Sequence, residues 1–362
     1  MAQKYTKNSM GYYHTRVWDG TWVNGKKHYK QVYSSKSSKD LERKVLEITT
    51  QVNNRVFTIK GDQSFTAYAD QWLKTYKASK SDNTKFMYQN LIDKHFACIT
   101  CNISDLTRSD YVNMMNAIKG NRTKQQAAMA FKQILKSAIH DKLLPAAALE
   151  EVLDGVDKVK YKPDEKRPLT EAEKAAIKAV DLSARDKAFL YLLYGCGIRR
   201  GECAALTRSD VNLDDLTLNV DKAYAYVEGR VILKDTKNTK HRVIPIPQDI
   251  VPILKEYFKE LQYNELFAMK DGKSLTKSSL DKMWRRILKG LQNVSEEPIE
   301  GLTPHIFRHN YCTILCKQVP AISLTDVAYL VGDSLQVVLN VYNHLQMDKT
   351  QVSNTVTSAF KL

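Results

Sequence analysis

The stretch ARDKAFLYLLYGCGIRRGE, residues 184–202, carries the clearest structural signal in the C-terminal half of the chain. Its apolar first part predicts a buried helix, and Gly195 and Gly197 predict where that helix ends, because glycine accepts the left-handed backbone of a helix C-cap. Arg199 then lies just past the helix end, held by packing on one side and free to face a cleft on the other. Glu202 is spaced to orient the Arg199 guanidinium through charge-assisted hydrogen bonds.

A short sheet is expected downstream of this stretch, around residues 216–246. Basic side chains crowd its second half and lead into the run Val243-Ile244-Pro245-Ile246-Pro247. These basic residues are Lys234, Lys237, Lys240 and Arg242. The pattern predicts a strand–turn–strand hairpin with a basic tip, which suits contact with the DNA backbone. By position alone, none of the four stands out from the others.

Two more polar groups follow on predicted helices. Thr303-Pro304 predicts a helix start, so His305 and Arg308 fall on one face, where they can bind two oxygens of one phosphate. The imidazole can also handle a proton. A partly buried helix with incidental polar groups is the competing interpretation. Tyr342 lies in a later helix that Ser334 can cap, and its apolar neighbours make core packing the default interpretation for it.

The composition points to an acidic partner. The chain has 362 residues, a formal net charge of +15 and a pI of about 9.3, a balance typical of nucleic-acid binding. Residues 1–60 hold 12 Lys or Arg against 4 Asp or Glu, an asymmetry that indicates a DNA-binding arm. The length fits two or three domains, and a hydrophobic content of 43% supports folded cores.

Export, membrane insertion and metal binding are not expected. The N-terminus leads into no apolar signal-peptide core, the apolar runs are too short to span a bilayer, and six cysteines in a chain this long make no disulfide framework. A soluble, cytoplasmic protein is the simplest expectation. Cys98 and Cys101, with His95 just before them, have the spacing of half a zinc site. No second pair completes that site, so core packing of these cysteines is favoured.

Residues 9–35 alternate in the manner of strands and turn at Asn24-Gly25, and residues 38–52 have helical periodicity. Basic residues interleave with aromatic residues in the strands, namely Arg16, Lys26, Lys27 and Lys30. This pattern suits phosphate contacts and groove insertion. A solvated basic strand surface explains the spacing equally well.

The remaining domain boundaries follow from periodicity and composition. Residues 64–155 predict a compact all-helical domain, because apolar side chains between Phe65 and Tyr76 recur at helical spacing. Further helices are predicted near residues 83–96, 109–118 and 122–143. Residues 156–168 are rich in Lys, Asp, Glu and Pro and predict a linker. A capping-box pattern then opens the last domain, residues 169–362.

In order and spacing, these motifs resemble those of the tyrosine recombinase family, specifically the integrases of phages and integrative mobile elements, over about residues 65–345. Gly197-x-Arg199-x-x-Glu202 matches the segment that carries the first catalytic arginine of the family, and Lys237, eight residues before Pro245, matches the hairpin lysine. His305-x-x-Arg308 matches the His-x-x-Arg pair of the family. Tyr342-x-His344 matches the segment that carries the nucleophile. Agreement of four motifs in one order is difficult to produce by chance.

The resemblance implies a multidomain α+β fold. Its parts are a small N-terminal three-stranded β-sheet plus a helix in an arm-type DNA-binding domain, an all-α core-binding domain, and a mainly α catalytic domain with a small antiparallel sheet and a C-terminal tail. It also implies double-stranded DNA as the partner, at a core attachment site and at arm-type sites, bound by a homotetramer in a bacterial cytoplasm. An excisionase and a DNA-bending protein are the candidate helpers, and no cofactor or metal is expected.

The resemblance also implies the reaction. Tyr342 would attack the scissile phosphate and form a 3′-phosphotyrosyl enzyme with a free 5′-hydroxyl. Arg199 and Arg308 would neutralise the non-bridging oxygens. Lys237 would protonate the leaving 5′ oxygen, and His305 would support proton transfer and phosphate binding. The ester keeps the bond energy, so no ATP is required.

Asp333 departs from the family pattern, which usually has histidine or tryptophan at that position, nine residues before the tyrosine. Three interpretations compete: a tolerated variant, an aspartate that turns away to cap the following helix, and an impaired enzyme. Two other functions stay open beside the integrase, namely DNA relaxation of the type IB topoisomerase kind and DNA-binding regulation without catalysis. General RNA binding is a more distant alternative, since no aromatic RNA-recognition motif is present.

Overall fold

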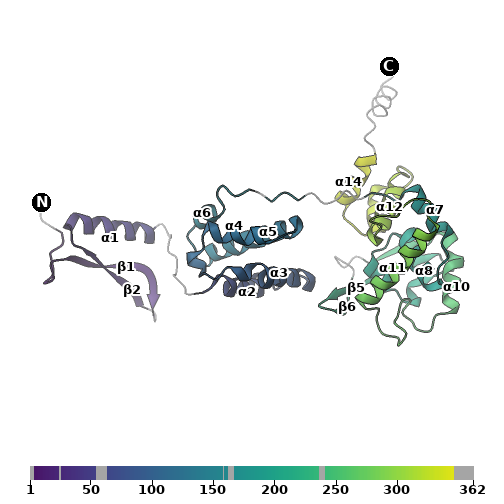
Figure 1. Cartoon of the computed structure of the whole chain (residues 1–362), viewed down its shortest axis with the longest axis horizontal. Coiled ribbons are helices and arrows are strands. Elements are labelled where there is room, and N and C mark those ends of the chain that lie inside the picture. Colours follow the sequence, from purple (N-terminus) through teal and green to yellow (C-terminus); the bar gives the residue numbers. More distant parts are fainter. Residues whose placement is uncertain are drawn as a thin grey trace, which may run out of the picture. The chain divides into compact units, whose positions relative to one another are not determined.

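The computed structural model describes residues 4–23, 26–53, 63–157, 159–161, 167–235 and 241–345 (Figure 1). The chain divides into two compact units, Met1–Pro163 and Asp164–Leu362. The first unit contains a small α/β module and a helical bundle, and the second contains helices with two small antiparallel sheets. None of the helices in the described ranges is long and apolar enough to cross a membrane.

The N-terminal module is an antiparallel hairpin packed on one helix. Strands β1 (Tyr13–Val23) and β2 (Lys26–Ser34) pair antiparallel, with an irregularity in the register between Trp18 and Trp22. Helix α1 (Ser38–Asn53) lies on one face of them (Figure 1). The small core between helix and hairpin consists of Tyr13, Val17, Val32 and Leu41. The helix expected over residues 38–52 is therefore confirmed to within one residue.

The expected third strand of this sheet does not form within the described residues. The sheet has two strands, and the segment before β1 adds only an isolated bridge between Lys7 and Tyr13. A tight turn explains the difference: the Asn8 side-chain oxygen accepts the backbone N–H groups of Met10 and Tyr12, both at 3.0 Å. An asparagine side chain that satisfies nearby backbone donors favours a turn over a strand ladder.

Residues 63–157 form the helical bundle that the apolar periodicity predicted. Its elements are α2 (Phe65–Tyr76), α3 (Asp82–Lys94), the 3-10 turns η1 (Phe96–Cys98) and η2 (Ile103–Asp105), α4 (Arg108–Ala117), α5 (Asn121–His140) and α6 (Ala148–Leu153). Five of the six residues of α2 that recur at helical spacing are buried, from Phe65 to Leu73. The sixth, Tyr76, is exposed. Part of the expected linker, residues 158 and 162–166, lies outside the described residues.

The second unit is built around one buried helix. The helices are α7 (Glu171–Ala179), α8 (Ala184–Cys196), α9 (Arg200–Ala204), η3 (Arg208–Asp210), η4 (Gln248–Ile250), α10 (Val251–Lys259), α11 (Lys277–Val294), α12 (Pro304–Cys316), α13 (Leu324–Val331) and α14 (Leu335–Leu345). Helix α8 contacts α9, α10, α11 and α12. Its apolar residues Phe189, Leu190, Leu192 and Leu193 are fully buried, which confirms the predicted buried helix.

The single sheet expected around residues 216–246 is two sheets in the structure. The first has the order β3 (Val211–Asn212), β4 (Thr217–Val220), β7 (Arg242–Pro245), and the second pairs β5 (Lys222–Val227) with β6 (Arg230–Asp235). The hairpin turn is Glu228-Gly229, where both residues have positive φ, as a two-residue hairpin turn requires. β6 therefore pairs with β5, and β7 with β4, so the hairpin expected between Lys234 and Arg242 is not formed by the described strands.

Gly197 ends α8 in the left-handed conformation that the sequence predicts, with φ of +60°. Gly195 lies inside the helix rather than beyond it. The Gly197 N–H donates to the Leu193 carbonyl, and a Cβ at Gly197 would overlap the Tyr311 ring. Because the turn and the close approach both need a residue without a side chain, this glycine determines the direction in which the chain leaves α8.

Gly197→Ala should lower the free energy of unfolding of the second unit by about 3 kcal/mol, since the left-handed backbone and the overlap with Tyr311 both destabilise alanine. Gly229→Ala is the matched control: its φ is +77° but a Cβ there meets nothing within 4 Å, so only the backbone cost of about 1 kcal/mol is expected. Urea denaturation measures the loss of unfolding free energy in each variant, and hydrogen exchange of α8 and of β5–β6 shows where the destabilisation lies. Equal losses in the two variants would contradict this account.

Candidate active site

Arg199 is the N-cap residue of α9, directly after the turn at Gly197. Glu202, in the first turn of α9, accepts the Arg199 backbone N–H at 2.8 Å and the guanidinium Nη1 at 2.9 Å. The Arg199 side chain is 26% exposed, whereas that of Glu202 is 1% exposed. The carboxylate therefore orients the arginine from inside the protein and leaves part of the guanidinium accessible.

Arg242 is the second partner of Glu202, and its position contradicts the expectation that it contacts DNA. Its side chain is 2% exposed, and its Nη2 donates to the Glu202 carboxylate at 2.6 Å. Its Nε donates to the Leu330 carbonyl at 3.1 Å. Strand alternation explains the burial, because Arg242 shares the buried face of β7 with Ile244. The alternation of Arg242 with Ile244 is the sequence signal for this burial, whereas the positive charge alone predicts the surface.

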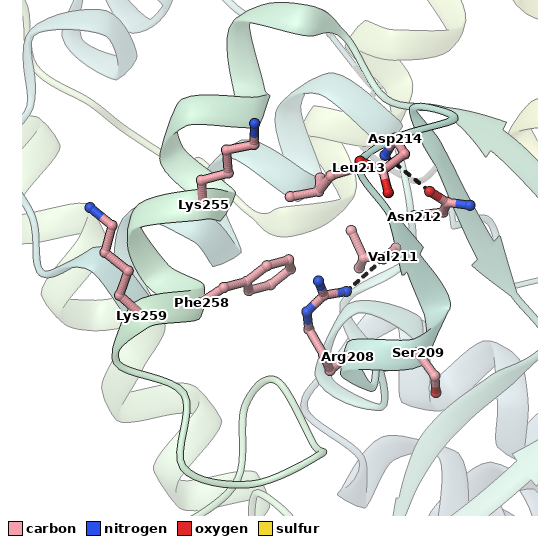
Figure 2. Close-up of a pocket in the computed structure, with 9 residues that line it drawn as sticks. All are labelled: Arg208, Ser209, Val211, Asn212, Leu213, Asp214, Lys255, Phe258 and Lys259. Atoms are coloured by element: carbon pink, nitrogen blue, oxygen red, sulfur yellow. Dashed lines mark hydrogen bonds between the residues drawn. The ribbon is translucent and has the colours of Figure 1, made fainter.

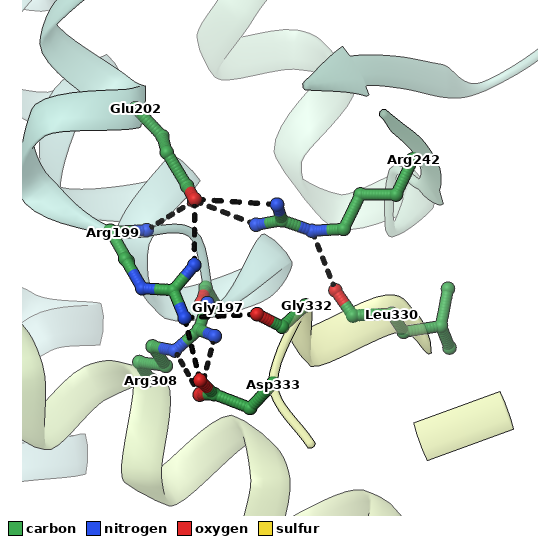
Figure 3. Close-up of polar contacts among 8 residues, drawn as sticks. All are labelled: Gly197, Arg199, Glu202, Arg242, Arg308, Leu330, Gly332 and Asp333. Atoms are coloured by element: carbon green, nitrogen blue, oxygen red, sulfur yellow. Dashed lines mark hydrogen bonds and ion pairs between the residues drawn. The ribbon is translucent and has the colours of Figure 1, made fainter. Parts of the chain in front are cut away.

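The Glu202 carboxylate stays ionised despite its burial. Burial alone raises the pKa of Glu202, but the hydrogen bond and charge of Arg242, together with the contacts from Arg199, outweigh it and hold the pKa at about 2. Glu202 consequently joins α9 to β7, and through Arg242 to the end of α13, as Figure 3 shows.

Arg308 lies one turn into α12 and is 2% exposed. Its Nη1 donates to the Gly197 carbonyl at 3.2 Å, which ties α12 to the end of α8. Burial, and next the charge of Arg199, lower the pKa of Arg308, although a guanidinium remains protonated at neutral pH. The structure thus brings the Arg199 and Arg308 guanidinium groups together, from two segments far apart in the sequence (Figure 3).

Asp333 lies between these two guanidinium groups. Its Oδ1 accepts Arg199 Nη2 at 2.6 Å, and its Oδ2 accepts Arg308 Nη2 at 2.6 Å. Burial raises the pKa of Asp333, but the two arginines outweigh it and lower that pKa below its ordinary value. The interpretation in which Asp333 turns away to cap the following helix is therefore wrong: opposite charge draws the carboxylate to the arginines instead.

The other predicted catalytic residues lie on the neighbouring helices or outside the described ranges. His305 is exposed in the first turn of α12, one turn before Arg308. Tyr342 is half-buried on α14 and packs against the apolar cluster that α12 and α13 form with α14. Lys237 lies outside the described residues, as does the side chain of His344.

The basic residues of the N-terminal hairpin divide between its two faces. Arg16 pairs with Gln31, and Lys30 pairs with Val17. Val17 is buried beneath α1, so Lys30 lies on the helix side of the sheet and Arg16 on the other. Both are exposed. They therefore do not share one sheet face for contact with DNA.

Three further DNA-binding candidates remain. The Lys27 ammonium lies over the Trp18 ring, 4.6 Å from its centroid. The side chain of Lys26 and the whole of Lys240 lie outside the described residues. The described part of the structure thus places Arg16, Lys27 and Lys30 on the N-terminal module.

No group of three His, Cys, Asp or Glu residues that could hold a metal ion occurs in the part of the chain that the structure describes. Cys101 is half-buried against the helical core, as core packing predicts, but Cys98 is exposed.

A pocket of about 600 Å³ lies in the second unit, between β3 and α10 (Figure 2). In it the Arg208 guanidinium carbon lies over the Phe258 ring, 4.3 Å from the ring centroid. Arg199, Arg308 and Asp333, together called the arginine site, do not line that pocket.

Sequence comparison relates the chain to known recombinases. A model of the phage integrase family matches residues 164–349. A XerC-like tyrosine recombinase of Caldanaerobacter subterraneus subsp. tengcongensis is 24% identical over an alignment of 404 positions, which covers 99% of this chain and 100% of the relative. A tyrosine recombinase of Agathobacter rectalis is 30% identical over 171 residues, 46% of this chain and 49% of the relative.

Comparison with solved structures shows a shared fold. The Tn1549 transposon integrase, in complex with a circular intermediate DNA, matches with a TM-score of 0.67 and 19% identity over 81% of this chain and 99% of that one. A lambda integrase dimer bound to a core site matches with a TM-score of 0.57 and 17% identity over 77% and 95% of the two chains. The expected α+β fold, with its helices and small antiparallel sheets, agrees with these structures.

Glu202→Gln should lower the free energy of unfolding of the second unit by about 3–5 kcal/mol at pH 7, because it leaves the buried Arg242 charge uncompensated. The Glu202 pKa is lowered from 4.5 to about 2, so this contribution is complete above pH 4.5 and lost as the pH falls toward 2. Urea denaturation at pH 7 and pH 3 tests both statements. Glu256→Gln, in an exposed pair with Lys259, is the control and should change stability by less than about 1 kcal/mol.

Proposed function

Because the chain belongs to the phage integrase family, whose relatives here are tyrosine recombinases, we propose that it is a site-specific DNA recombinase that integrates or excises a phage or mobile element. The observation that carries this proposal is the convergence of Arg199 and Arg308 on one anion. Tyr342 follows on α14, which begins two residues after that anion. Two fixed guanidinium groups suit stabilisation of a phosphodiester that exchanges an oxygen, and a tyrosine hydroxyl suits the nucleophile.

The first chemical step is attack of Tyr342 on the scissile phosphorus. A bond forms between the tyrosine oxygen and phosphorus, the bond to the 5′ oxygen breaks, and a 3′-phosphotyrosyl enzyme results. Arg199 and Arg308 stabilise the charge on the non-bridging oxygens. Lys237 gives the leaving 5′ oxygen its proton, and His305 assists in phosphate binding and proton transfer.

The second step reverses the first with a different strand. A 5′-hydroxyl from a second duplex attacks the phosphotyrosine, which restores a phosphodiester and frees the Tyr342 hydroxyl. The phosphotyrosyl ester retains the energy of the broken bond, so the proposed cycle consumes no ATP. Glu202 contributes indirectly, since it holds Arg199 in place.

Double-stranded DNA is the proposed substrate. The structural neighbours are integrases bound to DNA, including a lambda integrase tetramer on a Holliday junction, which matches with a TM-score of 0.57 and 15% identity over 91% of each chain. We propose that this chain likewise acts as a homotetramer on two duplexes. Residues 169–362 would carry catalysis, residues 64–155 would grip the core site, and residues 1–60 would bind arm-type sites. An excisionase and a DNA-bending protein are the proposed helpers.

A catalytically impaired regulator is the second candidate function, and the position of Asp333 is the observation that favours it. A carboxylate already bound by both arginines opposes a phosphate at the same place. DNA relaxation of the type IB topoisomerase kind involves the same covalent intermediate on one duplex. A basic N-terminal module, which offers a second DNA site, favours the recombinase over relaxation.

A trapped covalent intermediate tests the reaction. With a nicked, labelled duplex that carries a site selected by the full chain from random DNA, the wild-type protein should form an adduct that survives denaturant. Tyr342→Phe should form none, because phenylalanine lacks the nucleophilic oxygen. Tyr329→Phe is the control, since Tyr329 is an exposed tyrosine on α13, and its adduct should persist.

Other results of the same assay separate the candidates. DNA binding without an adduct in the wild type would establish the regulator and overturn the recombinase. Relaxation of supercoiled plasmid without exchange between two duplexes would establish the topoisomerase. Exchange of strands between two labelled duplexes is the result that the proposal requires.

The N-terminal module yields a separate prediction about DNA binding. Arg16 lies on the open face of the hairpin, opposite α1. Arg16→Ala should therefore weaken binding of selected arm-type duplexes about tenfold. It should also reduce the slope of log affinity against log salt concentration by roughly one, since one phosphate contact is lost. Lys30→Ala, on the helix side, should weaken it less. Fluorescence anisotropy of the full chain at several salt concentrations measures this, and a larger effect at Lys30 would place the DNA on the other face.

A further inference from the structure

The Asp333 carboxylate presents two oxygens to two arginines as a phosphate would. Oδ1 accepts Arg199 Nη2 at 2.6 Å, and Oδ2 accepts Arg308 Nη2 at 2.6 Å and Nε at 3.3 Å. Two non-bridging oxygens of a phosphodiester are the same kind of acceptor for paired guanidinium groups. The carboxylate thus occupies the positions that a bound phosphate would use.

This contact compensates a charge that is otherwise difficult to bury. Arg308 is 2% exposed, and its described hydrogen-bond acceptors are the Asp333 carboxylate and the neutral Gly197 carbonyl. The neighbouring anion, Glu202, is held by Arg199 and Arg242. In the absence of DNA, Asp333 therefore supplies the negative charge that a buried guanidinium needs.

We propose that Asp333 is an internal competitor for the scissile phosphate, which occupies the arginine site until DNA binds and must leave it for the phosphate to enter. The inference rests on the proposed function, since it takes the arginine site to be the phosphate site. Phosphate and carboxylate cannot share the site, because two anions at contact distance repel one another. Only molecules in which Asp333 has vacated the arginines can bind phosphate, so the apparent phosphate affinity is the intrinsic affinity multiplied by that fraction.

The backbone before Asp333 is fixed, so the Asp333 side chain can leave the arginines only if Asp333 and the residues after it move. Arg242 Nε donates to the Leu330 carbonyl at 3.1 Å, and Arg199 Nη2 donates to the Gly332 carbonyl at 2.9 Å. Gly332 also has φ of +67°, and a Cβ there would lie 2.8 Å from Arg242. The chain up to residue 332 is thus held by contacts that do not involve the Asp333 side chain.

The segment after Asp333 is less constrained. At the start of α14, Leu335 and Val337 are 43% and 45% exposed, and the helix reaches the core only at Val338, which is fully buried. Weakly buried helix ends open at low free energy. Release of Asp333 consequently loosens the start of the helix that carries Tyr342. Entry of the phosphate is therefore linked to the loosening of the start of α14, the helix that carries Tyr342.

Inorganic phosphate is the probe that tests the competition without DNA or catalysis. Its affinity for the full chain at pH 8 is measured by the rise in melting temperature with phosphate concentration. Asp333→Asn and Asp333→His remove the negative charge and should bind phosphate roughly tenfold to a hundredfold more tightly than the wild type, as expected when charge-assisted hydrogen bonds no longer compete. Asp333→Glu keeps the charge and should remain near the wild type.

Asp281→Asn is the matched control. Asp281 pairs with Arg200 at 2.8 Å and has a similar exposure, 40% against 30% for Asp333, but it lies outside the arginine site. Its loss should leave phosphate affinity unchanged. A similar gain in Asp281→Asn would mean that total charge alone governs binding, which would overturn the proposal.

Hydrogen exchange supplies the second readout. Saturating phosphate should speed amide exchange over residues 335–338 in the wild type, whereas Asp333→Asn should show the faster exchange already without phosphate. Equal phosphate affinity in the Asn, Glu and wild-type proteins would overturn the proposal. So would failure of both neutral variants to fold in saturating phosphate, since phosphate should replace the lost carboxylate.

The two proposals fail separately. Tight phosphate binding by Asp333→Asn, with no covalent adduct from the wild type, would support the internal competitor while overturning the recombinase chemistry. An adduct from the wild type, with no gain of phosphate affinity in Asp333→Asn, would do the reverse.

Discussion

The buried ion pair between Glu202 and Arg242 is the interaction on which the candidate site depends. Each side chain is almost fully excluded from solvent, so neither charge is tolerable alone. The pair joins α9 to β7, and Arg242 extends the connection to the last turn of α13 through the Leu330 carbonyl. Three segments from different parts of the chain are thereby held around one point. Arg199 owes its orientation to the same carboxylate.

The arginine site forms because segments far apart in the sequence meet in the fold, and no single local motif contains it. Gly197 turns the chain out of α8 so that Arg199 follows immediately, and its carbonyl receives Arg308 from α12. One short turn therefore positions both guanidinium groups. The Asp333 carboxylate lies between the two guanidinium groups and offsets the repulsion between their charges.

Periodicity predicted the helices well, because features such as the apolar stripe from Phe65 to Leu73 are local properties of the sequence. Pairing of strands was predicted poorly, since the partner of β7 is β4 and nothing adjacent in sequence indicates it. The burial of Arg242 follows from the alternation of β7, which turns it inward, and its charge alone predicts the opposite. The contact of Asp333 with two arginines depends on tertiary proximity, which spacing along a chain does not contain. Lys237 stays a prediction.

The anchoring of the backbone around Gly332 has a consequence for how such a site can evolve. The Leu330 and Gly332 carbonyls hold this loop to the arginines through main-chain atoms, which every amino acid possesses. The side chain at position 333 can therefore change from an imidazole or an indole to a carboxylate while the loop keeps its course. Selection can adjust the charge that faces the substrate at this one position, and the framework that presents it need not be rebuilt.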